Sequence, residues 1–221
     1  MNVAKRLGAL ATSTALALGL GLTAAPQASA LPADETNDFL AQLTATYNDP
    51  TGPADENPYD FDIVTKAVLV TGADKTLASL DTFTLFAPND RAFEVLAKRL
   101  GLLDKNHRFG RTVDEKMVTE KIVAALGVDA ITQVLLYHVF PAAKVTGADV
   151  LGGPFYQRLT MANGQKLGVV VLSRSARFPL IALLDRDGRF LNDRVVTSKI
   201  DVVETENTVV HGISDVLLPN L

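Results

Sequence analysis

The hydrophobic period of this chain changes along its length. Between residues 61 and 139, apolar side chains recur every three or four positions, which is typical of amphipathic helices, with one β-prone segment at 82–86. From residue 159 onward, short apolar segments separated by turn residues are typical of strands. A helix-rich half followed by a strand-rich half predicts an α+β domain.

The expected helices each combine an apolar stripe with a stop signal. They span residues 38–47, 61–69, 90–100, 119–126 and 129–139. Asn89 or Asp90 is suited to cap the third helix, and Asp129 the last. The stop signals are Gly72, Gly101, Gly127 and Pro141.

The expected strands are short. They span residues 82–86, 159–162, 166–172, 180–184, 194–197, 199–204 and 208–213, followed by a short element at 215–218. Asn163-Gly164 is a strong hairpin signal between the second and third strands. The charged segment 102–118 is expected to be a surface excursion, and the chain shows no internal repeat.

The first 58 residues are expected to precede the compact domain. Residues 1–30 combine Lys5 and Arg6 with an apolar run and small residues, which indicates a signal peptide and a mature start at Leu31. The alternative is an uncleaved membrane anchor, because the run approaches the bilayer thickness. Residues 31–58 are predicted to form an acidic helix and linker, with the domain at 59–221.

The composition excludes disulfides and argues against nucleic acid as a partner. There is no cysteine, so a secreted product would have no disulfides and would depend on its hydrophobic core. The net charge is −4, and it becomes −6 without Lys5 and Arg6, since residues 1–30 hold no acid. This balance argues against nucleic acid as the partner.

The charges are unevenly distributed, which suggests a partner surface. Residues 31–62 contain eight acidic residues and no lysine or arginine. Residues 98–111 instead carry five basic residues against Asp104 alone. The simpler interpretation is a solvated acidic leader and a solvated basic loop, or a loop that folds back onto the acidic segment.

Signals for catalysis are absent from the sequence. The histidines His107, His138 and His211 form no HxH or HxxxH pair, there is no thiolate, and no GxSxG elbow occurs. Asp185-Arg-Asp-Gly188 lacks the further ligands of a calcium loop and is expected to be a turn. We therefore expect no enzyme, no metal and no cofactor, although two glycosidase carboxylates would leave no sequence signal.

Three segments resemble the motifs of the fasciclin domain family, in the family's order: Thr84–Phe93, Leu136–His138 and Thr208–Pro219. The resemblance implies a wedge-shaped β-sandwich flanked by helices, in which the first and last segments supply central strands. This chain has Asn207-Thr208 where the family often has Asn-Gly, so a longer loop over Thr205–Thr208 is expected. The motif residues are Thr84, Phe86, Ala87, Pro88, Asp90, Phe93, Tyr137, His138, Val210, His211, Leu218 and Pro219.

The resemblance also implies a function. We expect a secreted, non-catalytic binding module of bacterial type that mediates adhesion or protein interaction at the cell surface or matrix. The alternative is an extracellular carrier of an apolar small molecule such as a carotenoid. The partner is expected to be an extracellular or cell-surface protein, or an acidic polymer.

Two regions are candidates for the binding surface. His138 shares a helical face with apolar residues, so we expect it to be buried and hydrogen-bonded, although the family motif has been linked to adhesion. Its neighbour Tyr137 is expected to be exposed. The other region is the basic loop, whose contacts would come from Lys105, Arg108, Phe109 and Arg111.

Overall fold

The computed structural model describes residue 42 and residues 57–110, 112–186 and 193–220. The expected leader 1–30, and the acidic segment 31–58 apart from Gln42, Asn57 and Pro58, lie outside the described residues. Over the described ranges, every helix is too short or too polar to span a bilayer.

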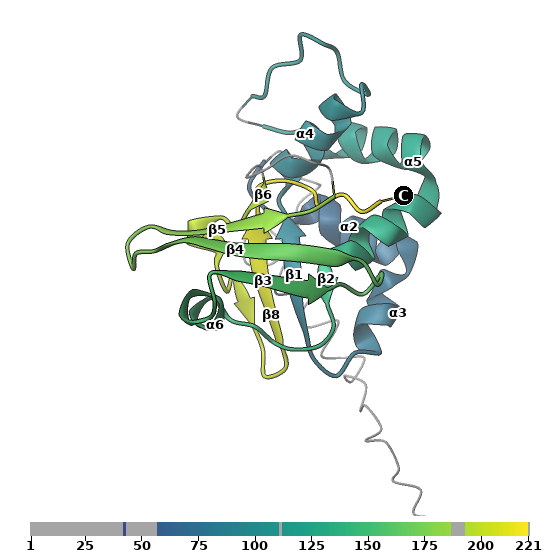
Figure 1. Cartoon of the computed structure of the whole chain (residues 1–221). Helices are drawn as coiled ribbons and strands as arrows, with labels where there is room; N and C mark the ends of the chain where they lie inside the picture. The colour runs from purple at the N-terminus through teal and green to yellow at the C-terminus, as the bar shows by residue number, and fades with distance from the viewer. Residues whose placement is uncertain (1–41, 43–56, 111, 187–192, 221) are drawn as a thin grey trace, which may run out of the picture.

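Two four-stranded sheets and a group of helices form the domain (Figure 1). The strand order in the first sheet is β2-β1-β8-β7, and in the second β3-β4-β5-β6. The strands of the first sheet are β1 (Phe83–Pro88), β2 (Val139–Phe140), β7 (Val203–Glu204) and β8 (Thr208–Ile213). Those of the second are β3 (Tyr156–Thr160), β4 (Lys166–Arg174), β5 (Pro179–Leu184) and β6 (Asp193–Arg194).

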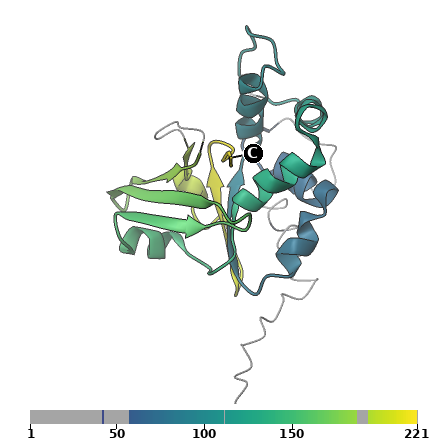
Figure 2. The same ribbon diagram turned by 45° about the vertical axis from the view of Figure 1, so that its right-hand side comes forward.

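The helices cover one face of the first sheet, and the second sheet lies on its other side (Figure 2). The helices on that face are α2, α3, α4 and α5, while the short α6 lies beside the second sheet. Their bounds are α2 Asp62–Thr71, α3 Ala73–Ala78, α4 Asp90–Arg99, α5 Glu115–Tyr137 and α6 Gly147–Gly152. The predicted α+β class is confirmed.

The central pair of the first sheet, β1 and β8, separates two hydrophobic cores. These strands run parallel from the pair Phe83 and Thr208 to the pair Pro88 and Ile213, and all residues of both are buried. Phe83 and Leu85 pack with the helices, whereas Phe86 and Ile213 pack with the second sheet. The expectation that the first and last motifs supply central strands is confirmed.

Helix boundaries follow capping residues. Asn89 caps α4 by accepting the Ala92 N–H (3.0 Å), and Gly72 and Gly101 adopt the left-handed conformation after α2 and near the end of α4. The predicted start at 119 is wrong, because α5 begins four residues earlier, at Glu115. Asp114 caps it by accepting the Met117 N–H (2.9 Å). The elements α3, α6 and β2 were not predicted.

The strand-rich half matches its prediction in the middle, but the predicted strand 159–162 lies at Tyr156–Thr160, and the end of the half also differs. The β3–β4 hairpin is confirmed, with Gly164 at φ 80°. The predicted strand 199–204 is wrong in its first part, because a 3-10 turn at Thr197–Lys199 and a positive φ at Asp201 leave only β7. The predicted strand 194–197 is reduced to the last residue of β6 and one bridge, and 215–218 is irregular.

The kink in α5 generates a stability prediction. Gly127 has φ 75° and ψ 164°, a backbone region that essentially only glycine occupies. Gly127→Ala should therefore lower the free energy of unfolding by about 1–3 kcal/mol in urea titrations followed by circular dichroism. Gly152→Ala, at an uncrowded helical position, is the control and should change it by less than about 1 kcal/mol. If Gly127→Ala destabilised the protein no more than Gly152→Ala does, the kink would tolerate a side chain.

Candidate functional site

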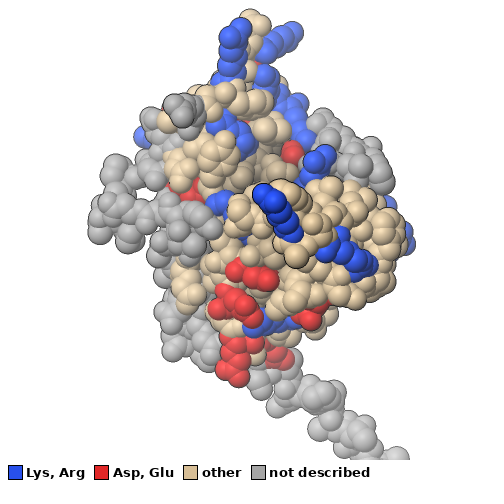
Figure 3. Space-filling view, turned by 90° about the vertical axis from the view of Figure 1, so that its left-hand side faces the viewer, with Lys and Arg blue, Asp and Glu red and all other residues tan. Residues whose placement is uncertain are grey.

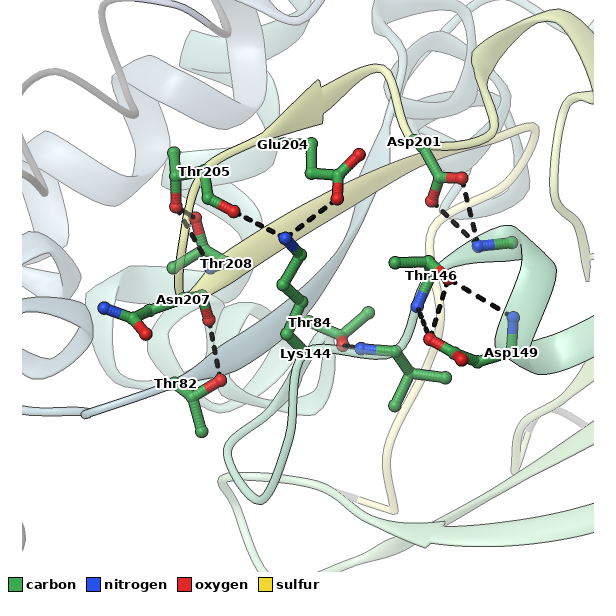
Figure 4. Close-up of polar contacts among 12 residues, drawn as sticks. Thr82, Thr84, Lys144, Thr146, Asp149, Asp201, Glu204, Thr205, Asn207 and Thr208 are labelled. Atoms are coloured by element: carbon green, nitrogen blue, oxygen red, sulfur yellow. Dashed lines mark hydrogen bonds and ion pairs between the residues drawn. The ribbon is translucent and has the colours of Figure 1, made fainter.

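A polar network fastens the segment before α6 to the central strands (Figure 4). Thr84 Oγ1 on β1 donates to Ala143 O (2.8 Å) and accepts the Val145 N–H (2.9 Å). Lys144 Nζ donates to Thr205 O (2.6 Å) and pairs with Glu204 Oε1 (2.8 Å). The motif threonine is thus a structural tie between β1 and this segment.

The same network fixes the start of α6 and the end of the first sheet (Figure 4). Thr146 and Asp149 form a reciprocal capping box, and Asp201 Oδ1 accepts the Gly147 N–H (2.9 Å). Thr82 Oγ1 donates to Asn207 O (2.6 Å) beside the turn that connects β7 and β8. Most of these partners are main-chain groups, so the network is occupied in holding the fold.

His211 on β8 is held as a neutral imidazole. Its Nδ1 accepts the Asp201 N–H (3.2 Å), which leaves Nε2 to donate to Val145 O (2.9 Å). Its ring lies 5.8 Å from that of Phe86. Burial lowers the pKa of His211, outweighing the hydrogen bond to Val145 and the nearby Asp201 carboxylate. Both ring nitrogens are therefore used by the backbone.

His138, directly after α5, joins the second motif to the third. Leu217 N–H donates to its Nε2 (3.0 Å), so its Nδ1 must carry the proton that is donated to Val134 O (2.7 Å). The side chain is 1% exposed, and burial lowers its pKa to about 4. The expectation of a buried, hydrogen-bonded histidine is confirmed.

The expectation that Tyr137 is exposed is wrong. Its side chain is 0% exposed, and its hydroxyl donates to Lys166 O (2.9 Å) on β4. Burial is the main cause that raises its pKa to about 12. Since the ring packs in the core beside the second sheet, Tyr137 is not part of the surface.

The other motif residues also support the fold. Phe93 belongs to the core beneath the helices, and Val210 lies in the same core. Ala87 pairs with Gly212 and Pro88 with Ile213 across the parallel strands. Leu218 is partly buried and Pro219 is buried near the C-terminus.

Sequence reasoning missed a buried carboxyl cluster. The carboxylate oxygens of Asp60, Asp90 and Glu115 lie within 4.8 Å of one another. Oxygen ligands of this kind coordinate hard cations. Their positions are too far apart along the chain to be linked by a motif. Asp90 Oδ1 accepts the Ile63 N–H (2.9 Å), and Glu115 pairs with Lys66 (3.3 Å).

The cluster retains protons and lies beside lysine. Burial, followed by the hydrogen bond with Asp60, raises the pKa of Asp90 far above its usual range. Burial likewise raises the pKa of Glu115 to about 7. The Lys199 ammonium donates to Tyr59 O and interacts electrostatically with Asp60 and Asp90. Shared protons and this lysine limit the repulsion between the carboxyl groups.

The basic loop is the part of the segment 98–111 that follows α4, and its described residues 102–110 fold back onto α4. Glu94 on α4 pairs with His107 (Nε2 to Oε1, 2.6 Å) and with Arg91. Lys98 Nζ donates to His107 O (2.6 Å), and Arg91 donates to Gly110 O (2.6 Å). Helix α4 is thus the anchor of this loop.

The outer side of the loop presents an aromatic ring among cations. Phe109 is 44% exposed, and Lys98 Nζ lies 4.9 Å from its ring centre. Lys105 and Arg108 are exposed, while Arg111 lies outside the described residues. Lys and Arg side chains gather at the top of the molecule, where this loop lies, whereas Asp and Glu gather lower on the face shown (Figure 3).

Two apolar cavities in the described part of the chain are small. One of about 20 Å³ lies between α4 and α5, lined by Phe93, Ile131 and other apolar side chains. Another, of about 10 Å³, lies between the two sheets beside Phe86 and Val169. Sites for drug-sized ligands occupy roughly 300–1,000 Å³, so neither cavity has the size of a carrier site.

Comparison with known proteins identifies a family. The family model of the fasciclin domain matches residues 59–219. The structure of a FAS1 domain pair from the insect cell adhesion molecule fasciclin I is similar, with a TM-score of 0.46 and 16% sequence identity. That match covers 71% of this chain, which spans 43% of the length of the insect protein's chain. No curated protein sequence matches.

The hydrogen bonds of His138 predict a pH-dependent contribution to stability. His138→Ala should lower the free energy of unfolding by about 2–4 kcal/mol at pH 7, through two lost hydrogen bonds and a cavity. Because the folded pKa is about 4 and the ordinary value is 6.5, the contribution is complete above pH 6.5 and falls as the pH falls toward 4.

Urea titrations of wild type and variant between pH 7 and 4 measure this difference, which should shrink by up to about 3 kcal/mol. Gln133→Ala, at an exposed position of α5, is the control and should be nearly neutral. A His138→Ala variant with full stability and lost partner binding would show that His138 is an exposed contact.

The carboxyl cluster predicts the opposite pH dependence. Since the raised pKa keeps Asp90 protonated near neutrality, Asp90→Asn should change stability at pH 7 by less than about 1 kcal/mol. Stability linked to a raised carboxyl pKa is lost as the pH rises through that pKa, so the variant should gain on wild type between pH 7 and 10.

The measurement is a set of urea titrations across that pH range. Asp104→Asn, at an exposed position, is the control and should follow wild type. A loss of more than about 2 kcal/mol at pH 7 in Asp90→Asn would show that the ionised carboxylate is required instead.

Proposed function

Because this chain belongs to the fasciclin domain family, we propose that it is an extracellular, non-catalytic binding module that attaches to an acidic partner at the cell surface or matrix. The contact is made by the loop between α4 and α5. Residues 1–30 are its signal peptide and Leu31 the mature start, as expected for a secreted bacterial protein. The family match supports the binding role, and the leader composition supports secretion.

The observation that carries the proposal is the anchored presentation of Phe109. The hydrogen bond between His107 and Glu94, and the two hydrogen bonds to loop carbonyls, hold the loop against α4 before any partner arrives. A preorganised loop loses less conformational entropy on binding than a free one. Lys105 and Arg108 of the same loop are exposed, and their charge would steer an acidic partner toward it.

The state of the histidines favours binding over catalysis. His138 and His211 each use both ring nitrogens on backbone groups, and burial holds the pKa of each below its ordinary value. Neither can accept a substrate proton without breaking a bond that supports the fold. The third histidine, His107, lies on the loop that we assign to binding, where it pairs with Glu94 of α4.

The cavity sizes favour a surface contact over the carrier role. The apolar cavities given above reach only about 20 Å³ within the described residues, far below the size of a carotenoid site. Neither of these cavities supports the carrier alternative, and the exposed loop is the better-supported contact.

The proposal predicts salt-sensitive binding that depends on the loop. Lys105→Ser combined with Arg108→Ser should weaken binding of the full chain to immobilised poly-L-glutamate about 30-fold at low salt. This follows from about 1 kcal/mol for each cation near an anionic surface. Surface plasmon resonance across a salt series measures the effect. The free energy of unfolding should stay within about 0.5 kcal/mol of wild type.

The control carries the same charge change elsewhere. Lys75→Ser combined with Lys116→Ser removes two exposed lysines from α3 and α5 and should leave binding nearly unaltered. If both double variants bind equally well at every salt concentration, the loop is not the contact.

A further inference from the structure

A second charged surface lies on the outward face of the second sheet, away from the basic loop. Leu159, Leu167 and Leu183 point inward to the core between the sheets. Their strand neighbours alternate to the other side, so the cross-strand row Arg158, Gly168 and Leu184 faces outward. Figure 2 shows this sheet at the side of the molecule opposite the helices.

A hollow of about 200 Å³ opens on this face. It is lined by Tyr156, Arg158, Lys166, Gly168, Leu184, Asp185 and Arg186. Gly168 forms part of the floor: an added Cβ would lie 3.1 Å from the Tyr156 ring and 3.1 Å from Leu184 Cβ. The missing side chain therefore lets the Tyr156 ring lie across the strand as a wall, and that ring remains 45% exposed.

Among the described residues, the cations of the hollow make no salt bridge. Arg158 Nε donates to Tyr156 Oη (3.3 Å), and Lys166 Nζ donates to Thr160 Oγ1, both neutral acceptors. The side chain of Arg186 is exposed, and its backbone N–H donates to Leu218 O (3.3 Å). Asp185 is the acidic residue of the lining, and its Oδ2 accepts the Leu218 N–H (2.7 Å).

Three cations and one carboxylate give the hollow a formal charge of +2. Like charges on neighbouring strands repel, so this arrangement contributes nothing favourable to the fold by itself. Arrangements that are costly for stability and lack a structural role are typical of binding surfaces. Guanidinium groups match phosphate oxygens by bidentate hydrogen bonds, and a lysine adds a point charge.

We propose that this hollow binds the phosphate group of a larger ligand, with Arg158, Lys166 and Arg186 as its anion contacts and Tyr156 as its wall. A phosphate monoester carries nearly two negative charges at neutral pH, which matches the +2 of the site. The phosphate belongs to a soluble phosphorylated molecule or to a lipid headgroup, and the experiment separates these sources.

The test uses the full chain and two probes. Pyrophosphate is titrated by isothermal calorimetry at constant ionic strength, with sodium chloride as the matched monovalent salt. Vesicles of phosphatidylcholine with and without phosphatidic acid are tested by co-sedimentation. We expect saturable binding of at least one phosphate probe. Binding of pyrophosphate indicates a soluble ligand, and binding confined to phosphatidic acid vesicles indicates the lipid source.

Matched variants assign the site. Arg158→Gln combined with Arg186→Gln should weaken phosphate binding at least tenfold while the melting temperature stays within a few degrees of wild type. The loop variant with Lys105→Ser and Arg108→Ser should retain it, so failure of this proposal is distinguishable from failure of the loop contact. Tyr156→Phe should cause a smaller, several-fold loss, because the wall remains while the hydroxyl that orients Arg158 is removed.

Three outcomes would overturn the proposal. The first is no binding of either phosphate probe by wild type. The second is an equal response to chloride, which would show general screening. The third is unchanged binding in the double arginine variant.

Discussion

The parallel pairing of β1 with β8 is the constraint on which the rest of the domain depends. The two strands lie at opposite ends of the described domain in sequence, yet they are paired along their whole length and buried on both faces. One face completes the core beneath the helices, and the other completes the core beside the second sheet. Without this pair neither core could close, and the chain has no disulfide to substitute for it.

Two buried histidines secure the segments that flank this pair. His138 ties the end of α5 to Leu217, just after β8, while His211 ties β8 itself to Val145 and Asp201. Each bond satisfies a main-chain group that would otherwise be buried without a partner. The stability of the fold is therefore sensitive to acid, since protonation of either imidazole would remove the ring nitrogen that accepts a backbone N–H. The carboxyl cluster near α2 acts in the opposite direction, because its retained protons favour the fold at lower pH.

Local backbone rules explain how much of the fold the sequence predicts. Gly72, Gly127 and Gly164 mark a helix end, a kink and a hairpin because their positive φ suits glycine, and each lies where it was expected. The start of α5 was missed although Asp114 is a good cap. Thr146 and Asp149 likewise have capping-box spacing, and α6 was missed because it is only six residues long.

Tertiary contacts explain what the sequence could not predict. Tyr137 carries a polar hydroxyl, as many surface residues do. It is buried because the second sheet covers it and the Lys166 carbonyl accepts a hydrogen bond from its hydroxyl. The carboxyl cluster joins residues from three separate segments, and no spacing in the chain reveals it. The hollow on the second sheet depends on strand register, which places Arg158 opposite Gly168. The basic loop was recognisable from composition, whereas its anchor, Glu94, was not.

The roles of the motif residues indicate where specificity in this chain must lie. Thr84, Tyr137, His138 and His211 are buried and bound to main-chain groups, so these side chains support the fold and are not accessible to a partner. We propose that a partner contacts instead exposed residues between and beside the motifs, because the fold positions these residues without burying them. Fold and function are separable in this way because the residues that close the core are not those that reach solvent. The loop anchored by Glu94 and the outward face of the second sheet are the two surfaces that we propose for this role. The exposed cations of both surfaces, Lys105, Arg108, Arg158, Lys166 and Arg186, lie outside the two hydrophobic cores, so replacing them should leave both cores intact.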